Sequence, residues 1–184
     1  MASLDPTIWT LHNTNVHDEL TKAGRGIKIL FVCLGNICRS PTAEAVLRAL
    51  AAREAPQLAL TVDSAGTSNY HPGAPADRRS QAAARERAYD LSALRARQVR
   101  DEDFTAFDLI LAMDRHNLRE LKLRAPPAAQ GKIQLFLDYA PEQPVREVPD
   151  PYYAGSNGFA DVLDLIEAAA RGLLRRLQSP APQS

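Results

Sequence analysis

The sequence predicts an α/β fold with a parallel sheet. Four apolar runs, at residues 27–32, 60–62, 107–113 and 133–137, alternate along the chain with segments of helical spacing. The first run is apolar and β-branched except for Lys28, as expected for a strand buried on both faces of a parallel sheet. Right-handed crossovers would place the helices on the faces of that sheet.

A helix is expected soon after the first strand. Pro41 suits the first helical position, because its missing N–H has no intrahelical partner there, and the helix should run to about Glu54. The second strand leads into a small, polar loop at residues 63–68. This loop follows the carboxyl end of a strand, where ligands of parallel sheets bind.

The second half of the chain continues the alternation. A helix is expected at residues 77–88 and a short turn of helix at residues 101–106. Asp114 is placed to cap a further helix that runs through Lys122. Apolar residues at helical spacing indicate a long last helix at residues 159–177.

These elements form one predicted domain, at residues 27–178. A chain of 184 residues is long enough to bury its own core. Residues 1–26 contain turn formers without sustained periodicity, which predicts a mostly loose N-terminal extension. Residues 179–184 are rich in proline and polar residues and predict a disordered tail.

Composition narrows the class of protein. Lysine and arginine total 22, as do aspartate and glutamate, so the net charge of zero gives no argument for nucleic acid or an anionic membrane. No apolar stretch approaches the roughly 20 residues needed to span a bilayer. Two cysteines and no signal-peptide pattern predict a cytoplasmic protein rather than a secreted one.

Both cysteines lie in one loop, which reads VCLGNICRSPTAEA at residues 32–45. A loop between a strand and a helix directs backbone N–H groups and the positive end of the helix dipole at one point, which favours an anion. The spacing C-x5-R differs from that of nucleoside triphosphate and dinucleotide loops. Gly35 and Asn36 are expected to supply left-handed backbone conformations.

Cys33 and Arg39 would contact the same tetrahedral oxyanion in such a loop. The guanidinium group of Arg39 offers the two-pronged contact that phosphate oxygens match. The groups that hold phosphate also stabilise a thiolate, and a thiolate in contact with phosphorus is a nucleophile. The alternative is that the short C-x5-R pattern arose by chance and that Cys33 is a small core hydrophobe.

Residues 32–45 closely resemble the active-site loop of the low-molecular-weight protein tyrosine phosphatases. Further stretches resemble motifs of this family in the same order: DSAGTS at 63–68, ARQV at 96–99, DF at 103–104, FDLILAMD at 107–114, NL at 117–118 and DPYY at 150–153. The resemblance covers about residues 27–177. It implies a four-stranded parallel sheet, doubly wound with helices on both faces, and hydrolysis of phosphotyrosine in proteins without metal or cofactor.

The resemblance also implies roles within the loop. Cys33 would attack phosphorus and form a cysteinyl-phosphate, while Arg39 and the loop amides hold the oxygens. Ser40 would hydrogen-bond the thiolate, and Asn36 would fix the shape of the loop. The loop residues expected to contact the substrate are Leu34, Gly35, Asn36, Ile37, Cys38 and Ser40.

Asp150 is the candidate general acid for the departing phenolate. Pro151 biases Asp150 toward extended backbone, although Asp-Pro on its own is an ordinary turn dipeptide. Tyr152 and Tyr153 are expected to form one aromatic wall of the site and Tyr70 a facing wall, unless Tyr70 is a plain loop tyrosine. A deep slot of this kind favours phosphotyrosine, because phosphoserine would not reach the thiolate.

One departure from the family stands out. Many relatives carry a histidine that braces the active-site asparagine, and the resemblance places Leu94 there, so the brace must be absent or replaced. The four histidines are scattered and show no metal-binding spacing: His12, His17, His71 and His116.

Two other functions stay open at this point. A thiol-linked arsenate reductase would use the same loop but generally needs further cysteines, and none follows Cys38. A phosphotyrosine-binding module would have no use for an acid at Asp150. The expected partner is a phosphotyrosine-containing protein, with a monomer as the working assumption and with no nucleic acid or membrane.

Cys38 itself has two interpretations. It could form a disulfide with Cys33 after oxidation by peroxide and so protect the nucleophile from irreversible oxidation. Alternatively, it only packs under the loop as a small apolar side chain.

Overall fold

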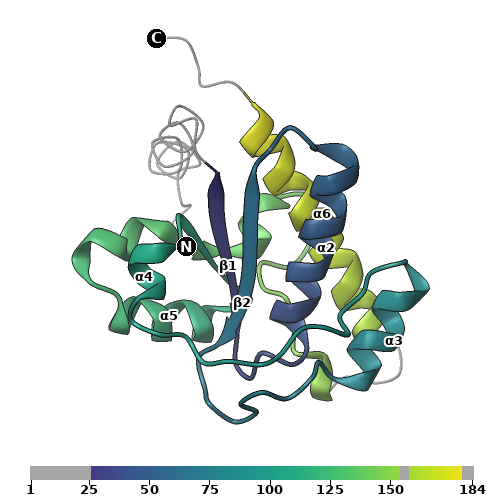
Figure 1. Ribbon diagram of the computed structural model, residues 1–184, viewed down its shortest axis with the longest axis horizontal. Coiled ribbons are helices and arrows are strands. Elements are labelled where there is room, and N and C mark those ends of the chain that lie inside the picture. Colours follow the sequence, from purple (N-terminus) through teal and green to yellow (C-terminus); the bar gives the residue numbers. More distant parts are fainter. Residues whose placement is uncertain (1–25, 154–157, 180–184) are drawn as a thin grey trace.

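A computed structural model describes residues 26–153 and 158–179 of the chain. It contains a four-stranded parallel sheet with helices on both faces (Figure 1), which confirms the predicted fold class. Most of the N-terminal extension, residues 1–25, and the end of the tail, residues 180–184, lie outside the described residues.

The order of the strands in the sheet is β2-β1-β3-β4, and all pairs are parallel. The strands are β1 (Ile27–Cys33), β2 (Leu60–Gly66), β3 (Leu109–Ala112) and β4 (Ile133–Leu135). From β1 the chain goes first to one neighbour and later to the other, so the winding direction reverses between β1 and β3. Such a reversal leaves a crevice at the carboxyl ends of the strands, where α/β proteins bind ligands.

The helices form a layer on each face of the sheet. Helices α2 (Arg39–Glu54) and α6 (Gly158–Gln178) lie side by side on one face, next to α3 (Arg78–Glu86) (Figure 1). Helices α4 (Asp103–Ala106) and α5 (Arg115–Arg124) cover the opposite face. The remaining helical turns are η1 (Pro127–Lys132), η2 (Phe136–Tyr139) and η3 (Pro151–Tyr153).

Alternation along β1 divides the core in two. Ile29 and Phe31 belong to the larger cluster, which includes the apolar faces of α2 and α6. Leu30 and Val32 belong to the smaller cluster, where they meet Phe104 at α4. All are fully buried. A strand buried on both faces is positioned by two cores, which fixes the end of β1 where the loop begins.

Most predicted elements appear, with shifted ends. Helix α2 begins two residues before Pro41, which is still in the first turn, where N–H groups lack intrahelical partners. Strand β2 extends through Gly66, so residues 63–66, expected as loop, pair with β1. Strand β4 stops at Leu135, and the chain turns into η2.

The expected cap of α5 is confirmed. The side chain of Asp114 accepts a hydrogen bond from the backbone N–H of Asn117 at 2.7 Å. Within residues 26–153 and 158–179, no helix has both the length and the apolar character needed to cross a membrane.

Candidate active site

The loop between β1 and α2 surrounds a pocket at the carboxyl end of the sheet. Cys33 is the last residue of β1, and Arg39 is the first of α2. The pocket has a volume of about 350 Å³. Its lining residues are Cys33, Leu34, Gly35, Ile37, Cys38, Arg39, Tyr70, His71, Asp150 and Tyr152.

Two hydrogen-bonding groups contact the sulfur of Cys33, which is 3% exposed. The backbone N–H of Asn36 donates to Sγ at 3.3 Å, and the hydroxyl oxygen of Ser40 lies 3.0 Å from it. The same hydroxyl oxygen accepts a hydrogen bond from Nδ2 of Asn36 at 2.9 Å, which leaves its own hydrogen for the sulfur or for the Ala65 carbonyl oxygen. The sulfur is therefore placed among polar groups at the floor of the loop rather than among apolar side chains alone.

Asn36 supplies the tight turn of the loop. Its φ of 55° lies in the left-handed region, as predicted. Gly35 does not adopt a positive φ, so the same prediction for Gly35 is wrong. Glycine at this position instead avoids a close contact, because a Cβ atom there would come 3.2 Å from Cδ2 of His71.

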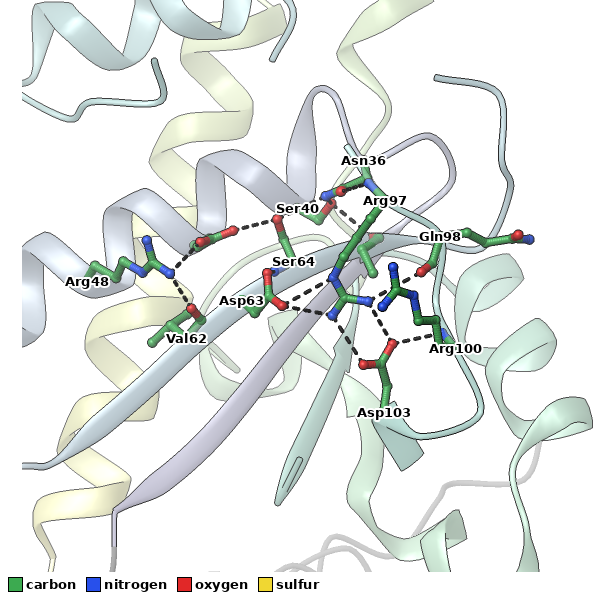
Figure 2. A network of polar contacts seen from close by, with 12 residues as sticks. Asn36, Ser40, Arg48, Val62, Asp63, Ser64, Arg97, Gln98, Arg100 and Asp103 are labelled. Carbon is green, nitrogen blue, oxygen red and sulfur yellow. Dashed lines mark hydrogen bonds and ion pairs between the residues drawn. The ribbon is translucent and has the colours of Figure 1, made fainter. Parts of the chain in front are cut away.

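A buried polar network holds Asn36 in this conformation (Figure 2). Nδ2 of Asn36 donates to the hydroxyl groups of Ser40 and Ser64, both at 2.9 Å. Oδ1 of Asn36 accepts from the backbone N–H of Arg97 at 2.9 Å. Leu94, expected at the position of a histidine brace, is a half-buried member of the larger core. In this chain the side chain of Asn36 is held by Ser40, Ser64 and the backbone of Arg97, and not by Leu94.

Ser64 is itself held from α2. Its hydroxyl donates to Oε2 of Glu44 at 2.6 Å, and Oε1 of Glu44 pairs with Arg48 at 2.7 Å. Glu44 is 3% exposed, and burial raises the pKa of its carboxyl group against the opposing effects of Ser64 and Arg48. Because Ser64 lies opposite Phe31 in the sheet, the contact depends on the register of β1 and β2.

The guanidinium group of Arg97 anchors the other end of the network. It pairs with Asp63 and with Asp103, each at 2.8 Å (Figure 2). Asp103 also accepts from the backbone N–H of Arg100 at 2.8 Å. The loop is thereby tied to α2, to β2 and to α4.

Arg39 is 3% exposed and contacts two carboxylates. Nη1 donates to Oδ2 of Asp114 at 2.6 Å and to the Val148 carbonyl oxygen at 3.1 Å. Nη2 donates to Oδ2 of Asp150 at 3.1 Å. Burial alone would lower the pKa of Arg39, but the charges of Cys33, Asp114 and Asp150 raise it, so the guanidinium group stays charged.

Asp150 lies at the mouth of the pocket, directly before the short turn η3. Its Oδ1 accepts from the backbone N–H of Tyr152 at 3.0 Å. The rings of Tyr70 and Tyr152 lie at the mouth and are largely exposed. The side chain of Tyr153, the remaining predicted wall residue, lies outside the described part of the structure.

Cys38 lines the pocket but is not arranged like Cys33. Burial raises the pKa of its thiol to about 12, in spite of a hydrogen bond with Ser80 that lowers it. Both cysteines are free thiols. At neutral pH, Cys38 is therefore a neutral thiol.

Sequence reasoning missed several residues at the site. Asp114 was expected only as a helix cap, and Glu44 only as a residue of the first helix. His71 was expected only not to bind a metal, yet it lines the pocket. A signal for Asp114 exists, because it follows a strand predicted to end beside the loop. No local pattern signals Glu44, whose role depends on packing between α2 and β2.

No cluster of side chains suited to a metal ion occurs within residues 26–153 and 158–179.

Known proteins match this chain over most of its length. The family model for low molecular weight phosphotyrosine protein phosphatase matches residues 28–182. The low molecular weight protein-tyrosine-phosphatase YfkJ of Bacillus subtilis is 40% identical, over 83% of this chain and 96% of its own.

Two solved structures are similar in fold and sequence. The protein tyrosine phosphatase of Entamoeba histolytica, with Hepes in the active site, superposes with a TM-score of 0.80 at 42% identity, covering 83% of this chain and 97% of its own. Vibrio vulnificus Wzb in complex with benzylphosphonate has a TM-score of 0.72 at 34% identity, covering 82% and 99% respectively.

Proposed function

The chain belongs to the low molecular weight phosphotyrosine protein phosphatase family and is a protein-tyrosine phosphatase, and we propose how its own residues carry out the reaction. The observation that supports the assignment most directly is the convergence of a buried cysteine, two hydrogen-bonding groups at its sulfur and a guanidinium group at the start of α2. This arrangement suits a cysteine nucleophile that attacks a bound phosphate monoester.

In the first step, the thiolate of Cys33 attacks phosphorus. The S–P bond forms as the bond from phosphorus to the tyrosyl oxygen breaks, and negative charge spreads over the three equatorial oxygens. Arg39 and the backbone of the loop residues that line the pocket would stabilise that charge. Ser40 then stabilises the sulfur as a leaving group for the second step.

Asp150 donates a proton to the departing phenolate. It lies at the pocket mouth, next to the guanidinium that would bind phosphate. A phosphate dianion in the loop would compete for Arg39 and so release the carboxyl group of Asp150 toward the leaving oxygen. In the second step, Asp150 takes a proton from water, which attacks phosphorus, breaks the S–P bond and releases inorganic phosphate.

The depth of the pocket supports phosphotyrosine as the substrate. Cys33 lies at the bottom and the exposed rings of Tyr70 and Tyr152 at the mouth, so an aryl group can extend between them while its phosphate reaches the sulfur. In benzylphosphonate, which Vibrio vulnificus Wzb binds, one atom separates the phosphorus from a benzene ring, as in phosphotyrosine. The partner would be a phosphotyrosine-containing protein.

A cytoplasmic location belongs to the same proposal. The nucleophile must remain a free thiolate, and the cytoplasm keeps cysteines reduced. Arsenate reduction is less well supported, because Cys38 is the only other cysteine and its thiol is neutral at physiological pH.

The test compares phosphate release from matched peptides that contain phosphotyrosine or phosphoserine. We expect phosphotyrosine to be favoured by about 100-fold or more, since misplacement by about 1 Å costs that much. The Cys33→Ser variant should show no turnover, because a serine hydroxyl does not ionise at this pH. Equal rates on both peptides would contradict the substrate assignment, and activity in Cys33→Ser would contradict the nucleophile.

A further inference from the structure

The segment that carries Asp150 has a second attachment outside the pocket. The guanidinium group of Arg79, on α3, lies over the ring of Tyr152 at 5.1 Å and over the ring of Phe159 at 4.7 Å. Tyr152 belongs to η3, and Phe159 belongs to the start of α6. One cation therefore contacts an aromatic ring on each side of residues 154–157.

Asp77 fixes the direction of this guanidinium. Its carboxylate accepts from Nε of Arg79 at 3.1 Å and from Nη2 at 3.0 Å, which is the two-pronged geometry that an arginine makes best. The same carboxylate caps α3 by accepting from the backbone N–H of Arg79 at 2.8 Å. The contact with Arg79 lowers the pKa of Asp77, so the pair persists into mildly acidic conditions.

The Asp77–Arg79 pair is also joined to the loop at residues 33–39, called the oxyanion loop below. The backbone N–H of Asp77 donates to the carbonyl oxygen of Ile37 at 2.7 Å. On the other side, the backbone N–H of Tyr152 donates to Oδ1 of Asp150. A short path of contacts thus runs from the loop through Asp77, Arg79 and Tyr152 to the carboxylate at the pocket mouth.

We propose that Arg79, oriented by Asp77, is a positioning residue for proton transfer: by docking the Tyr152 ring against α3 it fixes Asp150 at the distance from the loop that the leaving oxygen requires. This inference rests on the proposed role of Asp150. Arg79 does not line the pocket and touches no reacting atom, so its effect must pass through Asp150.

The experiment measures kcat/KM for aryl phosphates whose phenols differ in acidity. A weakly acidic phenol needs protonation more than a strongly acidic one. In Arg79→Gln we expect about a 10-fold loss on phenyl phosphate and about a twofold loss on para-nitrophenyl phosphate, a fraction of the effect of losing the acid. Arg79→Lys should lie between parent and Arg79→Gln, because it retains the charge without the planar group.

Two further variants make the test specific. Arg78→Gln, which changes the exposed neighbouring arginine of α3, is the matched control and should match the parent. In an Asp150→Asn background, Arg79→Gln should add less than about a twofold loss, since the residue through which it acts is already disabled.

Several results would overturn the inference. These are equal losses in Arg79→Gln on all substrates, full additivity with Asp150→Asn, or kinetics like the parent. If Arg79→Gln does not fold, as judged by its thermal midpoint, Arg79→Lys carries the same comparison. A normal leaving-group dependence in Asp150→Asn would instead reject Asp150 as the acid, and an inactive parent would reject the proposed function itself.

Discussion

The oxyanion loop and the segment at residues 150–152, called the acid segment here, face the same pocket but are held in different ways. Asn36, Ser64 and Glu44 hold the loop from beneath and are nearly inaccessible to solvent. The acid segment, by contrast, ends in Tyr152, which is 53% exposed, and is attached through Arg39 and the half-exposed Arg79. One side of the site has a buried polar framework, and the other has contacts that solvent can reach.

This difference matches what each side must do. The loop binds an ion of fixed shape, and pre-oriented donors stabilise a transition state without reorganisation. Breaking a buried network leaves unpaired groups at about 1–3 kcal/mol each, which keeps the loop rigid. Asp150 has to admit a substrate and exchange a proton, and its carboxylate, whose side chain is 33% exposed, stays within reach of water although its partner Arg39 is buried.

The largest predicted effect is on the loop side. Arg39→Lys should lower kcat/KM for phosphotyrosine peptides by about 100- to 1,000-fold, because one ammonium group cannot replace the planar guanidinium in a pre-organised anion site. Steady-state kinetics will check this, with Arg78→Lys, the same exchange at an exposed arginine of α3, as the control. Near-parental kinetics would mean that Arg39 only pairs with Asp114.

The acid side should show an effect that depends on the substrate. Asp150→Asn should lose about 100-fold in kcat/KM on phenyl phosphate, the lower end of what a general acid contributes, and much less on para-nitrophenyl phosphate. Arg39→Lys should lose equally on both. If Asp150→Asn also loses equally on both, the two sides do not differ in the way proposed here.

The network beneath the loop should reveal itself through pH and stability. Burial raises the pKa of Glu44 in the folded state, so Glu44 contributes most to stability at acidic pH and loses that contribution as pH rises through the raised pKa. As pH rises from about 4 to neutrality, the thermal midpoint of Glu44→Gln should therefore increase relative to that of the parent. A shift in favour of the parent would mean that the ion pair with Arg48 outweighs burial.

The smallest effect on turnover is expected at Cys38. Its pKa of about 12 keeps the thiol neutral, so iodoacetate at pH 7 should modify one cysteine per chain, Cys33. Cys38→Ser should keep turnover within about threefold of the parent, because a neutral thiol that makes no bond to phosphorus is replaced by a hydroxyl of similar size, worth at most about 0.5 kcal/mol. Mass spectrometry and initial rates will check both points.

Cys38 should matter only after oxidation. The parent inactivated by hydrogen peroxide should recover with dithiothreitol, and Cys38→Ser should not, if a disulfide with Cys33 protects the nucleophile. Equal recovery would leave Cys38 with a packing role only.

Local sequence predicted the loop well because its function depends on neighbours in the chain. Cys33 and Arg39 lie at the strand end and the helix start that their spacing indicated. The residues that hold Asn36 from other elements could not be found in this way. Ser64 reaches Asn36 only because β2 pairs with β1 in one register, and Glu44 reaches Ser64 only because α2 packs over both.

Conformational rules were less reliable than spacing. Both Gly35 and Asn36 suit positive φ, yet only Asn36 adopts it, since the network fixes its side chain, whereas Gly35 makes room for His71. The contacts of Arg79 could not be predicted from the sequence for another reason. Its contacts join three helical elements, and a surface arginine carries no sequence mark of the aromatic rings that it meets.

The two carboxylates on Arg39 have a consequence for competition among cellular anions. An anion binds the guanidinium group of Arg39 only if it interacts with it more favourably than the carboxylate of Asp150 does. That carboxylate already accepts a hydrogen bond from Nη2. Singly charged anions such as chloride offer no such advantage, while a phosphate dianion can contact several donors at once. Competition from the carboxylate of Asp150 therefore favours anions that make several contacts at once over monovalent ions.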